Sequence, residues 1–231
     1  MRMKKTACIV LFIGLSLYLL CGCTLPSSEE KPPEWMWPDT PHVQENEGVV
    51  RVSAGLLYAT NGDGTCNVKG MGSCEDSDLI IPPVAPNGDR VVAMDAQAFA
   101  GCAELISVSL PEGLTQIGND AFSCCDRLAT VHLPDSLRQI GERAFEDCKA
   151  LSDIHLPAGL VYIGEMAFDG CRRLKTVTFD KPAGWKGELW IEAGYVQLEE
   201  TVRIPSEELS DPLRAAEALK DTYLFYVWTR K

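Results

Sequence analysis

A 23-residue period in the middle of the chain constrains its fold more than any other feature. Residues 105–127, 128–150 and 151–173 read LISVSLPEGLTQIGNDAFSCCDR, LATVHLPDSLRQIGERAFEDCKA and LSDIHLPAGLVYIGEMAFDGCRR. Without gaps, Leu, Val or Ile, Leu-Pro, Leu, Ile-Gly, Ala-Phe and Cys fall at the same offsets in all three. A looser copy precedes them, and residues 174–179 begin another. Such a period is typical of a solenoid, in which each repeat needs its neighbours to bury its apolar face.

Each repeat is expected to open with a short strand. Leu105, Val108 and Leu110 should point into the core, while Ser107 and Ser109 point outward, because side chains alternate along a strand. The fold class predicted is an α/β-type solenoid with an N-terminal β-hairpin cap and a C-terminal α+β cap.

Stacking of the repeats should align identical residues in ladders about 4.8 Å apart. Gly118 is expected to allow a tight turn, and Cys125 to close the coil as a small apolar residue. The largest side chains would form one aromatic column, made of Phe99, Phe122, Phe145 and Phe168.

The first 22 residues have the composition of a targeting signal. Three basic residues among the first five precede an apolar run of 14, which is short for a membrane span of about 20 residues. The run ends in LCGC, which resembles a bacterial lipobox, so Cys23 is the predicted lipidation site. Ordinary secretion is the alternative. The protein is then expected to be exported and anchored to the membrane, on the extracellular face or in the cell envelope.

Four further segments follow the signal. We expect a lipidated Cys and Pro-rich tether at 23–48, an N-terminal hairpin cap at 49–78, leucine-rich repeats at 79–180 and a C-terminal cap at 181–231. Trp35-Met36-Trp37 could rest on the membrane interface or on the folded domain, or be exposed incidentally. In the hairpin segment Cys66 and Cys74 form a possible disulfide, because an exported protein meets oxidising conditions.

The C-terminal cap has its own sequence signals. Asp211-Pro212 provides a helix start, with a capping acceptor followed by proline in the first turn. The segment is rich in aromatic residues, and an aromatic patch that binds sugar or choline is the functional alternative to a structural cap.

The repeat pattern L-x-x-I-x-L-P-x-x-L-x-x-I-G-x-x-A-F-x-x-C resembles the BspA-like leucine-rich repeat. The flanking GMGSCEDSDLIIPP and the C-terminal segment also resemble sequences around such arrays, so the resemblance covers about 57–230. Asp95 replaces the Gly of the first copy, and Val161-Tyr162 is bulkier than usual. The resemblance implies a surface-exposed or secreted protein, sometimes adhesive to host matrix or cells, and implies no active site.

Charge and motifs argue against several functions. The formal net charge is −12 and no basic run occurs, so nucleic acid is not an expected partner. The sequence contains no phosphate loop, GxSxG, HExxH or GxGxxG motif. We therefore expect no catalytic residues, no cofactor and no enzyme activity.

Two groups of residues deserve separate consideration as chemical sites. One cysteine per repeat, at 102, 125, 148 and 171, indicates a buried column of thiols, and not zinc. Cys124 is expected to be exposed, and whether it is free is open. His132 and His155 share one offset beside Asp153 and are weak candidates for a metal or pH-sensitive site, with solvated strand positions as the ordinary alternative.

The outward strand positions define the predicted binding face. Its residues are Ser107, Ser109, Thr130, His132, Asp153, His155, Thr176 and Thr178. We expect this face to contact a macromolecular partner, a protein or cell-surface ligand, while acylated Cys23 holds the lipid bilayer. The array is short for a high-affinity concave surface, so a structural scaffold or spacer of the envelope is the alternative.

Overall fold

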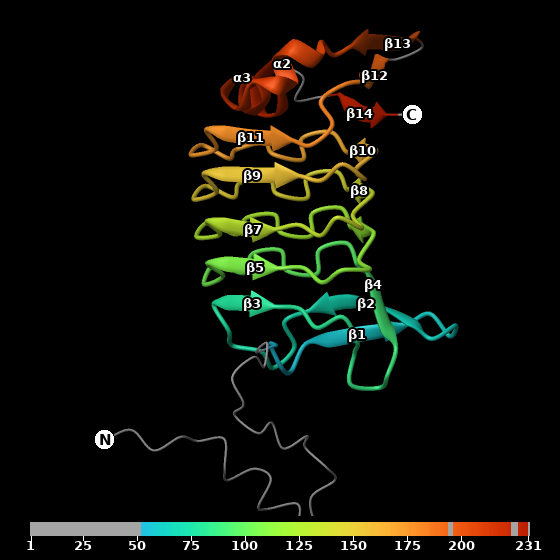
Figure 1. Ribbon diagram of the computed structural model, residues 1–231, viewed down its shortest axis with the longest axis vertical. Coiled ribbons are helices and arrows are strands. Elements are labelled where there is room, and N and C mark those ends of the chain that lie inside the picture. Colours follow the sequence, from blue (N-terminus) through green and yellow to red (C-terminus); the bar gives the residue numbers. More distant parts are fainter. Residues whose placement is uncertain (1–51, 194–195, 223–225, 231) are drawn as a thin grey trace, which may run out of the picture. The chain divides into compact units, whose positions relative to one another are not determined.

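Each repeat forms one coil that carries two short strands, and successive coils stack in register (Figure 1). The structure is a computed structural model that describes residues 52–193, 196–222 and 226–230. The signal peptide, Cys23 and the tether to residue 48 therefore lie outside the described residues. In the parallel ladders, Cα partners are one period apart, as in Val108 with Val131 and Ile117 with Ile140. The predicted solenoid is confirmed, but its α/β type is not: the coils between 57 and 180 contain strands and turns and no helix, so the array is a β-solenoid, and the described helices lie in the C-terminal cap.

Two sets of strands run up the stack. We call the first set the front face; it consists of β3 (Asp78–Ile80), β5 (Ser107–Ser109), β7 (Thr130–His132), β9 (Asp153–Leu156) and β11 (Thr176–Phe179). The second set consists of β4 (Arg90–Met94), β6 (Gln116–Ile117), β8 (Gln139–Ile140) and β10 (Tyr162–Ile163). The front face is a three-stranded sheet, β3-β5-β7, followed by the pair β9-β11. Within the described residues no ladder joins β7 to β9, although the two strands are neighbours (Figure 1).

A column of phenylalanine rings forms the centre of the array. Phe99, Phe122, Phe145 and Phe168 are fully buried. Successive ring centroids are 5.4 Å apart, and the interplanar angles are 9°, 7° and 11°. The predicted aromatic ladder is confirmed.

Backbone hydrogen bonds between coils run beside this column. The N–H of Phe99 donates to the carbonyl of Ala121 at 2.8 Å, and the N–H of Phe122 donates to Ala144 at 2.8 Å. These bonds give the segment around each phenylalanine a fixed partner in the next coil, although it is not a regular strand.

The glycine after each isoleucine has a different role from the one predicted. Gly118 does not adopt a positive φ; a Cβ on it would lie 2.6 Å from the backbone of Asp95 and Ala96. Glycine is therefore required by the close approach of stacked coils; the predicted tight turn does follow, at 119–120, but it does not depend on a left-handed glycine. In the first copy Asp95 faces the hairpin, where Asn67 Nδ2 donates to its carboxylate at 2.8 Å.

The left-handed turns occur at two later offsets of the repeat. One is occupied by Gln97, Asp120, Arg143 and Met166, with φ between 50° and 59°. The other is occupied by Gly101, Cys124, Asp147 and Gly170, with φ between 54° and 71°. Six of these eight residues are not glycine, although this region favours glycine.

A β-hairpin extends the second sheet at its N-terminal end. Strand β1 (Leu57–Thr60) pairs antiparallel with β2 (Thr65–Gly70), and β2 pairs parallel with β4. The connecting turn is 61–64, and the Asp63 carboxylate accepts bonds from the Thr65 amide at 3.0 Å and hydroxyl at 2.6 Å. This is the hairpin that the sequence predicts.

The C-terminal segment contains both helices and strands, as predicted. Its elements are β12 (Trp185–Ala193), β13 (Val196–Arg203), α2 (Ser206–Ser210), α3 (Pro212–Glu217), the π-helix η2 (Ala218–Thr222) and β14 (Val227–Arg230). β14 pairs with β10 and β12, so the sheet order ends β10-β14-β12-β13. The helices lie over β11 (Figure 1). The Asp211 carboxylate accepts from the amides of Leu213 and Arg214, which confirms the predicted helix start.

Aromatic packing closes the array at this end. Trp185 and Trp228 are each 1% exposed and pack on Phe179, with ring centroids 5.7 Å and 6.3 Å away. These two tryptophans are thus core residues, and they do not form the sugar-binding patch considered above. Within the described residues, no helix is both long and apolar enough to cross a membrane.

Candidate binding surface

The eight residues of the predicted binding face lie in two columns on the front face. The first column aligns Ser107 with Thr130 and Asp153 with Thr176, as Cα partners. The second aligns Ser109 with His132 and His155 with Thr178. All eight are exposed or half-buried, whereas the intervening Val108, Val131, Ile154 and Val177 are buried. The two-residue period of the strands therefore creates a polar surface over an apolar core.

Strand β3 extends both columns by one coil, which the sequence reading missed. Asp78 is the Cα partner of Ser107, and the Ser107 hydroxyl donates to its carboxylate at 2.6 Å. Ile80 is the partner of Ser109. The available signal was the short run DLIIPP, which repeats the apolar-Pro end of the later strands.

The structure does not bring His132 and His155 together with Asp153 in one cluster. His155 Nε2 lies 3.1 Å from Asp180, just beyond β11, while Asp153 accepts a bond from the Ser152 hydroxyl at 2.6 Å. His132 is exposed on β7, on the other side of the break between β7 and β9. Across the part of the chain that the structure describes, no group of three potential ligands could hold a metal ion.

Three cysteines of the predicted column are buried with defined acceptors, whereas Cys102, in the first coil, is only half-buried. The Sγ atoms of Cys125, Cys148 and Cys171 donate to the carbonyls of Phe99, Phe122 and Phe145 at 3.2, 3.2 and 3.1 Å. Burial raises the pKa of Cys125 and of Cys171 to about 12, and raises that of Cys148 further. A thiol that stays protonated is a poor nucleophile, so these residues are structural.

The remaining cysteines differ in exposure. Cys124 is exposed, as its offset suggests, and its backbone is in the left-handed region. Its thiol is free. Cys66 and Cys74 are both buried and free in the structure, where Cys66 Sγ lies 3.7 Å from the carbonyl of Asp89. The bridge between them is not formed here, and their pairing stays a prediction for the oxidised protein.

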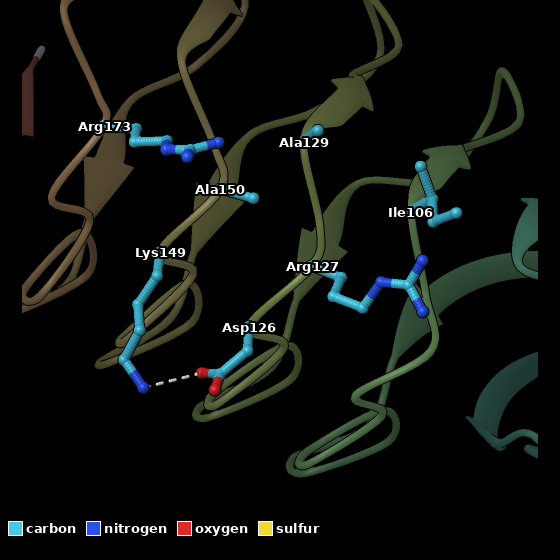
Figure 2. A pocket seen from close by; sticks show the side chains of 7 residues that line it. All are labelled: Ile106, Asp126, Arg127, Ala129, Lys149, Ala150 and Arg173. Atoms are coloured by element: carbon cyan, nitrogen blue, oxygen red, sulfur yellow. Dashed lines mark hydrogen bonds and ion pairs between the residues drawn. The ribbon is translucent and has the colours of Figure 1, made fainter.

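A shallow groove of about 500 Å³ lies where the coils enter their front-face strands (Figure 2). It is lined by Ile106, Asp126, Arg127, Ala129, Lys149, Ala150 and Arg173. Lys149 Nζ donates to Asp126 Oδ1 at 2.8 Å, and this bond raises the pKa of Lys149. Arg127 Nη1 binds Glu104 Oε2 at 2.6 Å. Sequence reasoning missed this groove; the signal was the recurrence of charged residues just before each strand.

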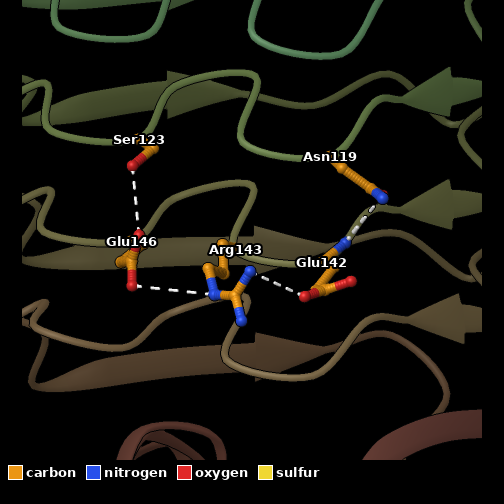
Figure 3. A network of polar contacts seen from close by, with 5 residues as sticks. All are labelled: Asn119, Ser123, Glu142, Arg143 and Glu146. Atoms are coloured by element: carbon orange, nitrogen blue, oxygen red, sulfur yellow. Dashed lines mark hydrogen bonds and ion pairs between the residues drawn. The ribbon is translucent and has the colours of Figure 1, made fainter.

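A second polar cluster, elsewhere on the coils, is internally compensated (Figure 3). Arg143 lies 2.8 Å from Glu142 and 3.9 Å from Glu146. The Ser123 hydroxyl donates to Glu146 at 3.2 Å, and the Asn119 side-chain carbonyl accepts from the Glu142 amide at 3.1 Å. These contacts link neighbouring coils and neutralise the charge of Arg143, so we assign the cluster a structural role.

The stacked coils define a leucine-rich repeat solenoid. The chain matches the family described as "BspA type Leucine rich repeat region (6 copies)" over residues 86–183. These residues are therefore a BspA-type leucine-rich repeat region, as the motif indicated. No curated protein matches the sequence.

Solved leucine-rich repeat proteins resemble this chain. A protein from Bacteroides capillosus is 26% identical, with a TM-score of 0.51, over 57% of this chain and 98% of that one. The T. pallidum leucine-rich repeat protein is 32% identical, with a TM-score of 0.48, over 52% of this chain and 56% of that one. The pneumococcal vaccine antigen PcpA is 26% identical, with a TM-score of 0.44, over 51% of this chain and 28% of that one. This chain thus spans only about half or less of two of these relatives.

Proposed function

We propose that this protein is an exported, lipid-anchored recognition module whose front face contacts a protein or another cell-surface macromolecule. Its anchor would be an acyl-modified Cys23 that follows a signal peptide at 1–22, with residues 23–48 acting as the tether. Catalysis has no place in this proposal, because leucine-rich repeat families serve binding and the buried thiols are poor nucleophiles.

One observation carries the proposal: small polar side chains stand in two columns on a regular face. Such a surface exposes hydroxyls, imidazoles and carboxylates at a fixed spacing while the valines and isoleucines between them hold the strands in place. Solenoids use surfaces of this kind for binding, and short polar side chains lose little conformational entropy on contact.

The experiment is site-specific photo-cross-linking on intact cells. A photoreactive residue at Thr130 or Thr178 should attach covalently to a partner, whereas the same residue at Gln139, exposed on the second sheet, should not. Equal labelling from both faces would refute the proposal that the front face is the contact surface.

The identity of the captured partner separates adhesion from scaffolding. An adhesin should capture an external ligand, and added soluble protein should compete with whole cells for that ligand. Capture of envelope proteins alone would instead favour the spacer role.

A further inference from the structure

Ion pairs between neighbouring coils show how this surface holds a carboxylate. Glu104 and Arg127 occupy the same offset in consecutive coils, and their side chains meet at 2.6 Å. One residue earlier in the repeat, Asp126 and Lys149 make the equivalent contact at 2.8 Å. In each pair the cation of one coil reaches back to an acid of the preceding coil, a geometry visible for Lys149 in Figure 2.

At both of these offsets the coils nearer the C-terminus carry no acidic residue. Ala150 precedes Arg173 by one coil, as Glu104 precedes Arg127. Arg173 therefore extends over a methyl group instead of a carboxylate (Figure 2). At the other offset Arg172 follows Lys149, which places like charges in adjacent coils. Among the described residues neither Arg172 nor Arg173 makes an ion pair, and Lys175 nearby is also exposed.

We propose that this groove binds an acidic peptide segment of a partner, with a glutamate or aspartate carboxylate held by Arg173. The carboxylate takes the position that a glutamate at 150 would occupy, as Glu104 does beside Arg127. A guanidinium donates two parallel bonds to a carboxylate, and Ala129 and Ala150 leave the floor of the groove open to one.

Charge and position favour a peptide over a small free anion. The chain carries a net charge of −12 and as a whole repels an acidic segment, whereas the exposed cations Arg172, Arg173 and Lys175 at one end of the groove attract it. The groove runs from Ile106 to Arg173 across neighbouring coils, so an extended chain can lie along it. This site is separate from the polar columns, and the inference does not depend on their role.

Fluorescence anisotropy with a labelled hexaglutamate peptide tests the inference. The full chain, in neutral detergent, should bind the peptide at low salt, and binding should weaken as salt rises. Arg173→Ala should raise Kd about 3- to 10-fold, the effect of removing one charge-assisted contact. Gln139→Ala, at an exposed position on the second sheet, should leave Kd unchanged.

Substitutions at Ala150 give opposite expected shifts. The offset accepts Glu or Arg in other coils, so both variants should fold. Ala150→Glu should pair with Arg173 and raise Kd by about 10-fold or more, Ala150→Arg should lower it, and Ala150→Gln controls for size. No binding, a Kd that ignores both Arg173→Ala and Ala150→Glu, or tighter binding of a sulfated hexasaccharide or anionic vesicles would overturn the inference.

Discussion

In the repeats, each coil adds a phenylalanine at the same offset to one stack, whereas the C-terminal cap packs aromatic side chains that each occur once. The four rings of the ladder are nearly parallel, at 7° to 11°. In the cap, Trp185 meets Phe179 edge-on at 72°, and Arg230 lies over the Trp185 ring at 5.3 Å. The repeats are stabilised by the same ring-on-ring contact in successive coils, whereas the cap is stabilised by a few contacts that each occur once.

Removing one ring from the ladder should have the largest effect. Phe145 is fully buried between two others, so Phe145→Ala should lower the free energy of unfolding by about 3–5 kcal/mol. Chemical denaturation measures this loss. Ala183→Gly, at an exposed position, is a control for nonspecific effects. A loss below about 1 kcal/mol would show that the ladder does not carry the core.

The cap should depend on a single arginine, with a smaller effect on stability. The Arg230 guanidinium donates to the carbonyls of Ala158, Leu160 and Lys181 at 2.5, 2.6 and 3.1 Å. Arg230→Ala leaves these acceptors without their donor and should cost about 1.5–3 kcal/mol.

The destabilisation caused by Arg230→Ala should be confined to the cap. Hydrogen exchange should accelerate in β12 and β14 but not in β5–β8, and Arg230→Lys should rescue it only in part. Equal acceleration in all coils would contradict the separation of cap and repeats.

Alkaline pH should weaken the repeats through their thiols. The pKa of Cys125 and of Cys171 is raised to about 12, whereas an unfolded thiol ionises near pH 9. Their contribution is fully present below pH 9 and is lost as pH rises toward 12, by about 1.4 kcal/mol per pH unit for each cysteine. Unfolding free energies at pH 8, 9.5 and 10.5 measure this slope, and Cys125→Ala should flatten it. An equal slope in the wild type and in Cys125→Ala would show that the Cys125 thiol does not contribute to the pH dependence.

The left-handed turn at Cys124 offers a smaller, stabilising change. Cys124 has φ of 60°, at an offset where two other coils carry glycine. Cys124→Gly should stabilise the protein by about 1 kcal/mol, because glycine adopts this conformation without the penalty of a Cβ. The melting temperature reports the change, and Gly101→Ala at the matching turn should lower it. A fall on Cys124→Gly would mean that the thiol makes a contact worth more than the strain.

The sequence predicts the features that repeat, and of the others it predicts those with a local signal, such as the hairpin turn at 61–64 and the helix start at Asp211. Period and alternation were sufficient for the coils, the phenylalanine ladder and the columns on the front face, because each rests on a residue that recurs at one offset. They were misleading at Gly118, where the requirement comes from the backbone of a neighbouring coil and not from the local turn. The docking of Arg230 on Ala158 joins residues 72 positions apart once, so no periodicity reveals it.

The candidate surfaces follow the same division. The polar columns were predictable as outward strand positions, but Asp180 beside His155 and Asp78 beside Ser107 depend on flanking segments. The groove was missed because it depends on a residue that departs from the repeat. Ala150 occupies an offset that is charged in the other coils, and only the stacking of the coils shows that Arg173 is the cation left without an acidic partner.

Disulfide trapping tests the stacking register most directly. Ser107 and Thr130 are Cα partners on adjacent exposed strands, so Ser107→Cys with Thr130→Cys should cross-link on mild oxidation in a Cys124→Ala background. Ser107→Cys with His132→Cys, offset by two residues, should cross-link far less. Mass spectrometry of the oxidised proteins is expected to find the in-register bridge; equal yields, or preference for the offset pair, would contradict the columns on which this account rests.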